Sequence, residues 1–185
     1  MSWKISIVKE ANRPDLPRQK MHIDVCAIPS FDVEKRPLLN HYNIVVPTEG
    51  ILVPVQSLQE TLADKLIALA YRARRIKPRD IWDIVWIKQR GVDLSKELIE
   101  KKLAARNKQI DDFCQALTIQ LAKLMQDDEV RDDFNREISR FIPKQIKERT
   151  LNNPEYWAYV RAEVSAMASA LLNDSTPKNK FDMGL

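Results

Sequence analysis

The sequence predicts an α+β fold in which a small sheet comes first and a helical bundle follows. Apolar residues recur with a period of two in the first part of the chain and with the period of an α-helix from Ser57 onward. The chain has 185 residues, of which 44% are hydrophobic and 30% charged, which is typical of a globular protein. We therefore expect a sheet region at 1–56, a helical domain at 57–172 and a disordered tail at 173–185.

Short stretches of alternating or continuous apolar residues mark the expected strands. Residues 3–8 alternate, and so does the segment MHIDVCAI at 21–28, where Asp24 lies on the polar side. The runs NIVVP and ILVPV flank Thr48-Glu49-Gly50 and predict a hairpin. Each of these two runs contains a proline, which keeps a strand short or at an edge.

Capping residues and breakers mark the expected helices. Ser57 is a suitable N-cap, and Glu60 at the third helical position would complete a capping box. Pro78 suits the first turn of the next helix, which should end before Gly91. Further helices are expected from Ser95 to about Ala105, over Ile110–Leu124, over Val130–Phe141, and from near Pro154 to Leu171.

Composition excludes several kinds of site. With only 3 glycines, the chain cannot form a glycine-rich phosphate loop. Its 2 cysteines and 2 histidines exclude a disulfide framework and argue against a zinc site. It has no apolar run of membrane-spanning length and no secretory pattern at its start, so we expect no membrane partner and a cytoplasmic protein. The net charge of +4 weakly favours an anionic partner.

Three charged residues fall where apolar residues are expected. Lys65 lies within the apolar stripe of the helix that starts after Ser57, and Asp80 and Asp83 share a face with Ile84 on the next helix. A buried charge must be paired or functional, because an isolated one costs several kcal/mol or changes its protonation state. The pattern therefore predicts either a structural salt bridge or a site built around Lys65.

Asp24 would add a third carboxylate to this set. It sits between β-branched residues in the middle of a strand, where aspartate has a low propensity. If Asp24 faces Lys65, the arrangement suits phosphoryl chemistry, in which a carboxylate holds a divalent metal and a lysine neutralises phosphate oxygens. The alternative is that Asp24 lies on the exposed face of a one-sided sheet.

A basic run connects the two helices. It places five positive charges within eight residues: Arg72, Arg74, Arg75, Lys77 and Arg79. The run would form either a solvated helix end, where cations complement the helix dipole, or a patch for a triphosphate or an RNA backbone.

The segments LQETLADKLIAL and KPRDIWDI resemble the nucleotidyltransferase toxins of the AbiEii and AbiGii type, which occur in bacterial abortive-infection and toxin–antitoxin systems. The matching positions are Asp64-Lys65 for the helix lysine, Arg79, Asp80 and Asp83 for the Arg-Asp-x-x-Asp motif, and Asp24 for the strand acid. The resemblance implies a polymerase-beta-like nucleotidyltransferase sheet followed by a helical C-terminal part.

The same resemblance implies an activity and its participants. The expected reaction transfers a nucleoside monophosphate from a nucleoside triphosphate to an acceptor such as RNA or tRNA, with Mg²⁺ as cofactor. Lys65 and Arg79 would bind the triphosphate, Asp24 would hold the metal, and Asp80 would orient Lys65. A cognate antitoxin would accompany the protein.

The chain also departs from the family. It contains neither the opening Gly-Ser turn nor an Asp-x-Asp pair, and its first glycine is Gly50. We expect a fragment, a late start, a degraded gene or a remnant repurposed for binding, with little transfer activity of its own. The competing interpretations are a non-catalytic nucleotide- or RNA-binding protein and a helical protein with buried salt bridges.

Overall fold

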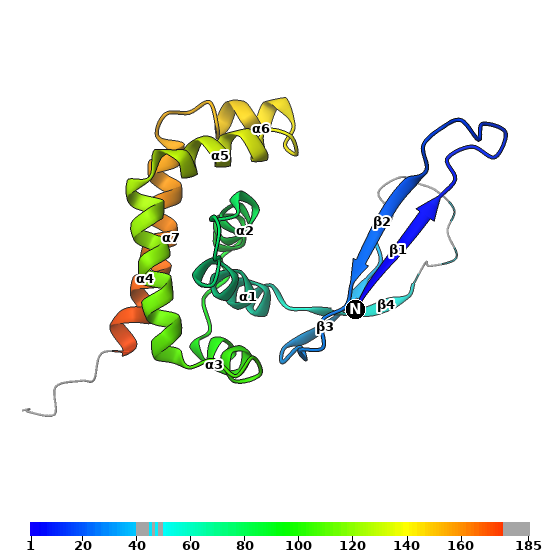
Figure 1. The fold of residues 1–185 in the computed structure, drawn as a ribbon. Helices are drawn as coiled ribbons and strands as arrows, with labels where there is room; N and C mark the ends of the chain where they lie inside the picture. Colours follow the sequence, from blue (N-terminus) through cyan, green and yellow to red (C-terminus); the bar gives the residue numbers. More distant parts are fainter. Residues whose placement is uncertain (40–44, 46, 48–49, 176–185) are drawn as a thin grey trace, which may run out of the picture.

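The computed structural model confirms the α+β class. It describes residues 1–39, 45, 47 and 50–175. Two two-stranded antiparallel sheets precede a bundle that contains every helix of the described part (Figure 1). No helix among the described residues is both long enough and apolar enough to cross a bilayer.

The first sheet is a hairpin of β1 (Ser2–Ile7) and β2 (Gln19–Asp24). Its register pairs Trp3 with Ile23 and Ile5 with Met21. Since directly paired residues point to the same side of a sheet, one face of the hairpin is apolar and the other polar. The alternation predicted from the sequence is therefore confirmed. The hairpin projects away from the helices (Figure 1).

The second sheet pairs β3 (Val33–Pro37) with β4 (Leu52–Gln56). Strand β4 matches the predicted strand ILVPV. The predicted partner run NIVVP and the turn at 48–50 lie largely outside the described residues. Among the described residues, β4 pairs with VEKRP, whose three charged residues gave no strand signal. This strand depends on pairing with β4 and not on a hydrophobic pattern.

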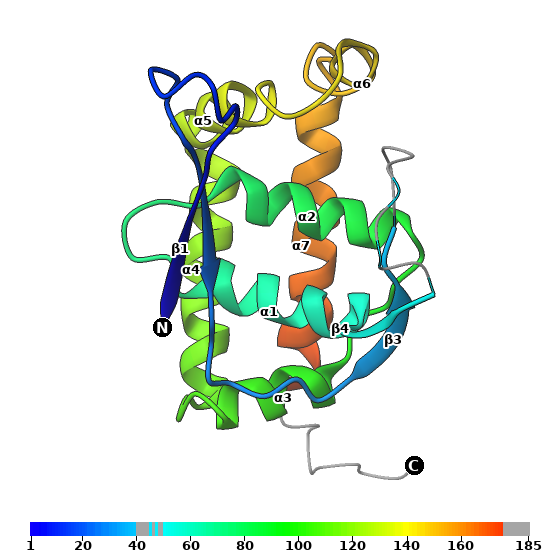
Figure 2. The ribbon, with the colours of Figure 1, turned by 90° about the vertical axis from the view of Figure 1, so that its right-hand side faces the viewer.

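The helices form the body of the molecule. They are α1 (Leu58–Ala70), α2 (Pro78–Gln89), α3 (Lys96–Ala104), α4 (Ile110–Gln126), α5 (Asp128–Ile138), α6 (Lys144–Arg149) and α7 (Tyr156–Ser175). Helix α1 packs against α2, α3 and α4, while α2 packs against α5 and α7. In Figure 2, α1 and α2 cross in front of α4 and α7, with α3 at one end of the bundle and α5 and α6 at the other.

The core lies in the helical part of the chain, which supplies it from the helices and from Ile76 in the loop before α2. Among the described residues, every buried one lies between Ser57 and Leu171. The largest fully buried side chains of the core are Phe113, Phe134, Leu62, Leu66, Leu69, Ile81, Ile84, Ile87, Ile99, Leu103, Leu117 and Leu124. Both sheets therefore lie outside the core, connected to it through the segment that leads into α1.

The predicted helix boundaries are largely confirmed. The hydroxyl of Ser57 accepts the N–H of Glu60 at 3.0 Å, and that of Ser95 accepts the N–H of Leu98 at 3.2 Å. Gly91 follows α2 with a φ of +75°, a left-handed conformation that glycine adopts without strain.

Two ends differ from the prediction. The helix predicted over 130–141 ends at Ile138, and α6 follows it as a separate short helix. Helix α7 continues to Ser175, three residues into the predicted tail, while residues 176–185 of that tail lie outside the described residues.

Candidate functional site

The packing of α1 on α2 brings three of the predicted charges together. The Lys65 Nζ lies 2.6 Å from Asp83 Oδ2 and 3.3 Å from Asp80 Oδ1. Lys65 comes from the middle of α1, whereas both aspartates lie in the first half of α2. The predicted contact between Lys65 and the Arg-Asp-x-x-Asp segment is thus present.

Asp80 holds a second cation as well. Its Oδ2 accepts hydrogen bonds from Arg72, with the Nε at 2.9 Å. The Arg72 carbonyl accepts the side-chain N–H of Gln120 at 3.0 Å, which fixes the chain after α1 against α4. Asp80 is only 5% exposed, so this one buried carboxylate positions two cations from two different segments. We refer to Lys65, Arg72, Asp80 and Asp83 as the Asp80 cluster.

Lys65 remains charged in this environment. Burial of the ammonium lowers the pKa of Lys65, but the hydrogen bonds and charges of Asp83 and Asp80 outweigh burial, so the pKa is raised above 10.5. The side chain is 28% exposed. An ammonium has three N–H donors, and the two aspartates account for two of them. Lys65 can therefore bind an anion without giving up either aspartate.

Asp24 is not part of the Asp80 cluster. It is the last residue of β2, exposed on the polar face of the hairpin and paired with Ser2. This position agrees with the alternative that Asp24 lies on the exposed face of a one-sided sheet. The ion pairs found for Lys65 in the described part of the chain go to Asp80 and Asp83 only.

The donor set does not fit a catalytic magnesium centre. No group of three or more His, Cys, Asp or Glu side chains able to hold a metal occurs among the residues that the structure describes. Asp80 and Asp83 already neutralise Lys65 and Arg72, and Asp24 lies on a separate hairpin. Two-metal phosphoryl transfer needs several carboxylates that converge on one point, and the described residues bring no such set together.

Arg79 faces away from Lys65. Its Nε lies 3.2 Å from Glu137, and its guanidinium carbon lies 3.9 Å from the centre of the Phe141 ring. The structure therefore places Arg79 against α5 and the segment after it, and not beside Lys65.

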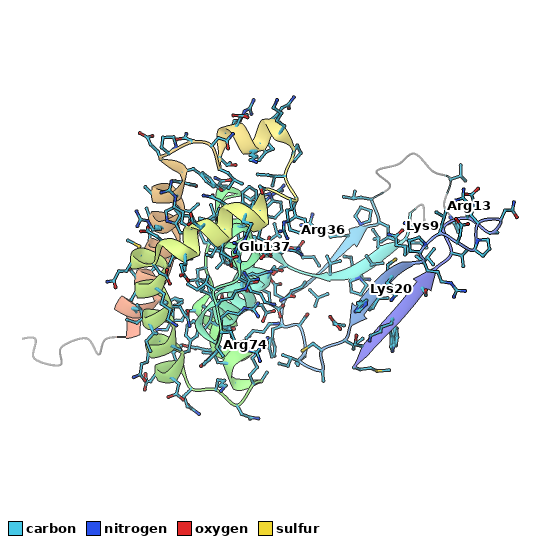
Figure 3. The ribbon with its side chains drawn as sticks, turned by 45° about the horizontal axis from the view of Figure 1, so that its top comes forward. Lys9, Arg13, Lys20, Arg36, Arg74 and Glu137 are labelled. Atoms are coloured by element: carbon cyan, nitrogen blue, oxygen red, sulfur yellow. The ribbon has the colours of Figure 1, made fainter. Side chains whose placement is uncertain are left out.

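The basic run is largely committed to internal contacts. Arg75 pairs with Asp133 and, at 3.3 Å, with Glu137, so it also connects to α5. Arg72 and Arg79 are paired as well, so three of the five cations of the basic run form ion pairs. Arg74 and Lys77 are exposed and take no ion pair within the described part of the chain. Figure 3 shows Arg74 and Glu137 on the bundle, whereas Lys9, Arg13 and Lys20 lie on the hairpin.

An open cavity of about 880 Å³ adjoins this run. The loop before α2, the end of α4 and α5 form its walls. Its charged lining residues are Arg74, Arg75, Lys123, Asp127, Glu129, Asp132, Asp133, Arg136, Glu137 and Arg140. The lining carries five basic and five acidic side chains, so the cavity does not favour an anion over a cation.

A second buried charge network was not predicted from the sequence. Lys102 of α3 is 3% exposed; it pairs with Glu60 and, at 3.0 Å, with Asp64. Asp64 also accepts hydrogen bonds from Arg106 at 2.8 Å and from Gln56 at 2.6 Å. The signal was present, since Lys102 follows the buried Leu98 by four residues in the apolar stripe of its helix.

Glu60 does not complete the predicted capping box. Its carboxylate instead accepts the backbone N–H of Phe31 at 3.0 Å and that of Asp32 at 2.7 Å. The Ser57 N–H, which the box would have satisfied, donates to the Asp32 carbonyl at 3.0 Å. Glu60 therefore ties the segment before β3 to the start of α1.

Comparisons with known proteins agree with the resemblance seen in the motifs. The family model described as "Nucleotidyl transferase AbiEii toxin, Type IV TA system" matches residues 2–162. No curated protein and no solved structure matches the chain. The matched region includes the hairpin that carries Asp24, the whole Asp80 cluster and most of the bundle. The chain therefore belongs to the family of AbiEii nucleotidyl transferase toxins of type IV toxin–antitoxin systems.

Proposed function

We propose that this chain binds a nucleoside triphosphate at Lys65, for transfer of the nucleoside monophosphate to an RNA acceptor. In that reaction an acceptor hydroxyl attacks the α-phosphorus and loses its proton to solvent. A new P–O bond forms, the bond between the α- and β-phosphates breaks, and pyrophosphate leaves. Membership of a type IV toxin–antitoxin family supports the triphosphate substrate and a cognate antitoxin.

The arrangement around Asp80 is the observation that carries this proposal. The buried carboxylate holds Lys65 and Arg72 at its two oxygens, so two cations are fixed without a ligand. Fixed cations stabilise phosphate oxygens without the cost of being ordered during binding. Asp80 would thus act by positioning Lys65, while the remaining N–H donor of Lys65 contacts the triphosphate. Arg79 would contribute only after leaving Glu137.

We further propose that the chain alone transfers little or no nucleotide. Asp24 is the metal ligand that the family motif implies, but it has no second and third carboxylate beside it among the described residues. The shortage of donors also favours a second candidate function, a non-catalytic nucleotide- or RNA-binding protein with the same fold.

Triphosphate binding is the first test. We expect nucleoside triphosphate titrations, followed by calorimetry, to show that Lys65→Ala weakens binding about tenfold or more, because a hydrogen bond between charged groups is lost. Lys88→Ala is the matched control, since Lys88 lies on α2 and pairs only with the exposed Asp93 in the described part. Equal affinity of the Lys65→Ala variant and the unchanged protein would refute the site.

Transfer is tested separately, with radiolabelled nucleoside triphosphates, magnesium and total RNA. We expect the purified chain to leave the RNA unlabelled even where it binds the triphosphate. Strong magnesium-dependent labelling that Asp24→Ala abolishes would contradict the proposed inactivity and also the non-catalytic alternative.

A further inference from the structure

One face of the β1–β2 hairpin carries only uncharged side chains and is uncovered in the described structure. The Val25 N–H donates a hydrogen bond to the Met1 carbonyl. This bond continues the register and adds one residue, Met1 or Val25, to each strand of the face. The apolar residues on this face are Met1, Trp3, Ile5, Ile7, Met21, Ile23 and Val25. The five that lie within the strands are 39–52% exposed, although such side chains are normally buried.

The exposed area is large for a surface feature. At roughly 150–250 Å² for a fully exposed large side chain, these exposed fractions leave about 500–900 Å² of apolar surface on this one face. Monomeric soluble proteins rarely expose more than a few hundred Å² in one patch. A two-stranded hairpin is also marginally stable by itself in water. Both considerations indicate that another surface covers this face.

We propose that the face is the interface between two copies of this chain, packed hairpin on hairpin about a twofold axis. Burial of the patch on both copies would remove roughly 1,000–1,800 Å² from water, which overlaps the range of stable protein interfaces. The side chains of the patch and of Gln19 are uncharged, so a self-complementary contact brings no like-charged side chains together. The N-terminal ammonium of Met1, at the end of the patch, lies 3.4 Å from the Val25 carbonyl. Lys4, Lys20 and His22 lie on the opposite face of the hairpin and would stay in solvent.

The position of the hairpin permits such a contact. It projects from the bundle with both faces exposed in the described structure, and it makes no extensive contact with any helix (Figure 1). Two facing sheets pack about 10 Å apart. A second hairpin can therefore be reached without moving the helical core.

The test measures the mass of the full chain in solution. We expect sedimentation velocity across the micromolar range to give twice the 21.5 kDa of the single chain. Ile5→Lys should raise the dimer dissociation constant about a hundredfold or more, because the lost apolar contact and the added charge occur twice in a symmetric interface. Ser6→Lys introduces the same charge on the opposite face of the same strand and should leave the dimer intact.

Hydrogen exchange provides a second readout that does not depend on a variant. The amides of β1 and β2 should exchange more slowly at high protein concentration, whereas those of α1 and α2 should not change. Circular dichroism confirms that the helices of each variant are folded. The proposal is overturned by a chain that stays monomeric at all concentrations, by a dimer that survives Ile5→Lys, or by equal effects of Ile5→Lys and Ser6→Lys.

Discussion

At the scale of single residues, Asp80 has the most demanding environment in the candidate site. It is buried and faces both Lys65 and Arg72, while Asp83 contacts Lys65 from the more exposed side, with 40% of its side chain accessible. Removal of a carboxylate from a buried ion pair leaves uncompensated charges, whereas an exposed ion pair adds little stability. The two aspartates should therefore differ strongly when each is replaced.

We expect Asp80→Ala to lower the free energy of unfolding by about 2–4 kcal/mol, because Lys65 and Arg72 both lose their shared partner. Asp83→Ala serves as the matched control and should cost less than about 1 kcal/mol. Urea titrations of both variants measure these values. Similar costs for the two replacements would contradict the central position of Asp80.

The raised pKa of Lys65 predicts a pH dependence. A cation whose pKa is higher in the folded state than in the unfolded state stabilises the fold fully below the unfolded pKa, here 10.5. This contribution is lost as the pH rises through the higher folded value. We expect unfolding free energies of the unchanged protein and of Lys65→Met to converge above pH 10.5. A difference that stays constant through this range would show that the protonation of Lys65 does not contribute.

At the scale of elements, a buried network joins the sheet segment to the helices. Glu60 of α1 binds the backbone before β3 and also Lys102 of α3. Lys102 donates to the Pro29 carbonyl as well, at 3.5 Å. These contacts fix the path by which the chain enters α1, although neither sheet contributes a buried residue to the core.

Replacement of Glu60 by glutamine should release this connection. We expect Glu60→Gln to lower the free energy of unfolding by about 3 kcal/mol, since Lys102 loses its fully buried charged partner and keeps only the partly exposed Asp64. The backbone amides of Phe31 and Asp32 should exchange faster with solvent. Glu97→Gln, which removes the exposed partner of Lys101 on the same helix as Lys102, should leave both measurements unchanged. Unaltered amide exchange in Glu60→Gln would disprove the connection.

At the scale of the whole molecule, cations are spread over two separate parts. Lys9, Arg13 and Lys20 lie on the hairpin, whereas the basic run lies at the start of α2 (Figure 3). Arg74 is exposed and takes no ion pair among the described residues, but Arg75 is neutralised by Asp133 and Glu137. The cations of the basic run should therefore contribute unequally to RNA binding.

We expect weak RNA binding that falls with salt concentration. Arg74→Ala should reduce the salt slope by about 0.7, the value for one phosphate contact on a single strand. Arg75→Ala should reduce it less, because two carboxylates already compensate that charge. Fluorescence anisotropy with single-stranded RNA over a range of salt concentrations measures both slopes. No binding at low salt, or identical slopes for all three proteins, would show that the basic run does not contact RNA.

The sequence by itself determined the local features of this protein. The order of sheet and helices, the caps at Ser57 and Ser95, and the face shared by Asp80 and Asp83 depend on spacings of a few residues. Backbone geometry fixes these spacings wherever the element lies in the fold. The contact of Lys65 with this face could also be predicted, because a lysine within an apolar stripe requires a partner on a neighbouring helix.

Only the tertiary structure decided the contacts between distant segments. Asp24 and Lys65 each satisfied the family pattern, yet the hairpin that carries Asp24 projects away from the bundle. Glu60 matched a capping box, but its carboxylate accepts the backbone N–H groups of Phe31 and Asp32, which lie 29 and 28 residues earlier in the chain. Within the described part of the chain, β4 likewise pairs with a strand that has no hydrophobic pattern. In each case the sequence offered several residues able to make the same ion pair, hydrogen bond or strand pairing. The path of the chain through space decided which of them came into contact.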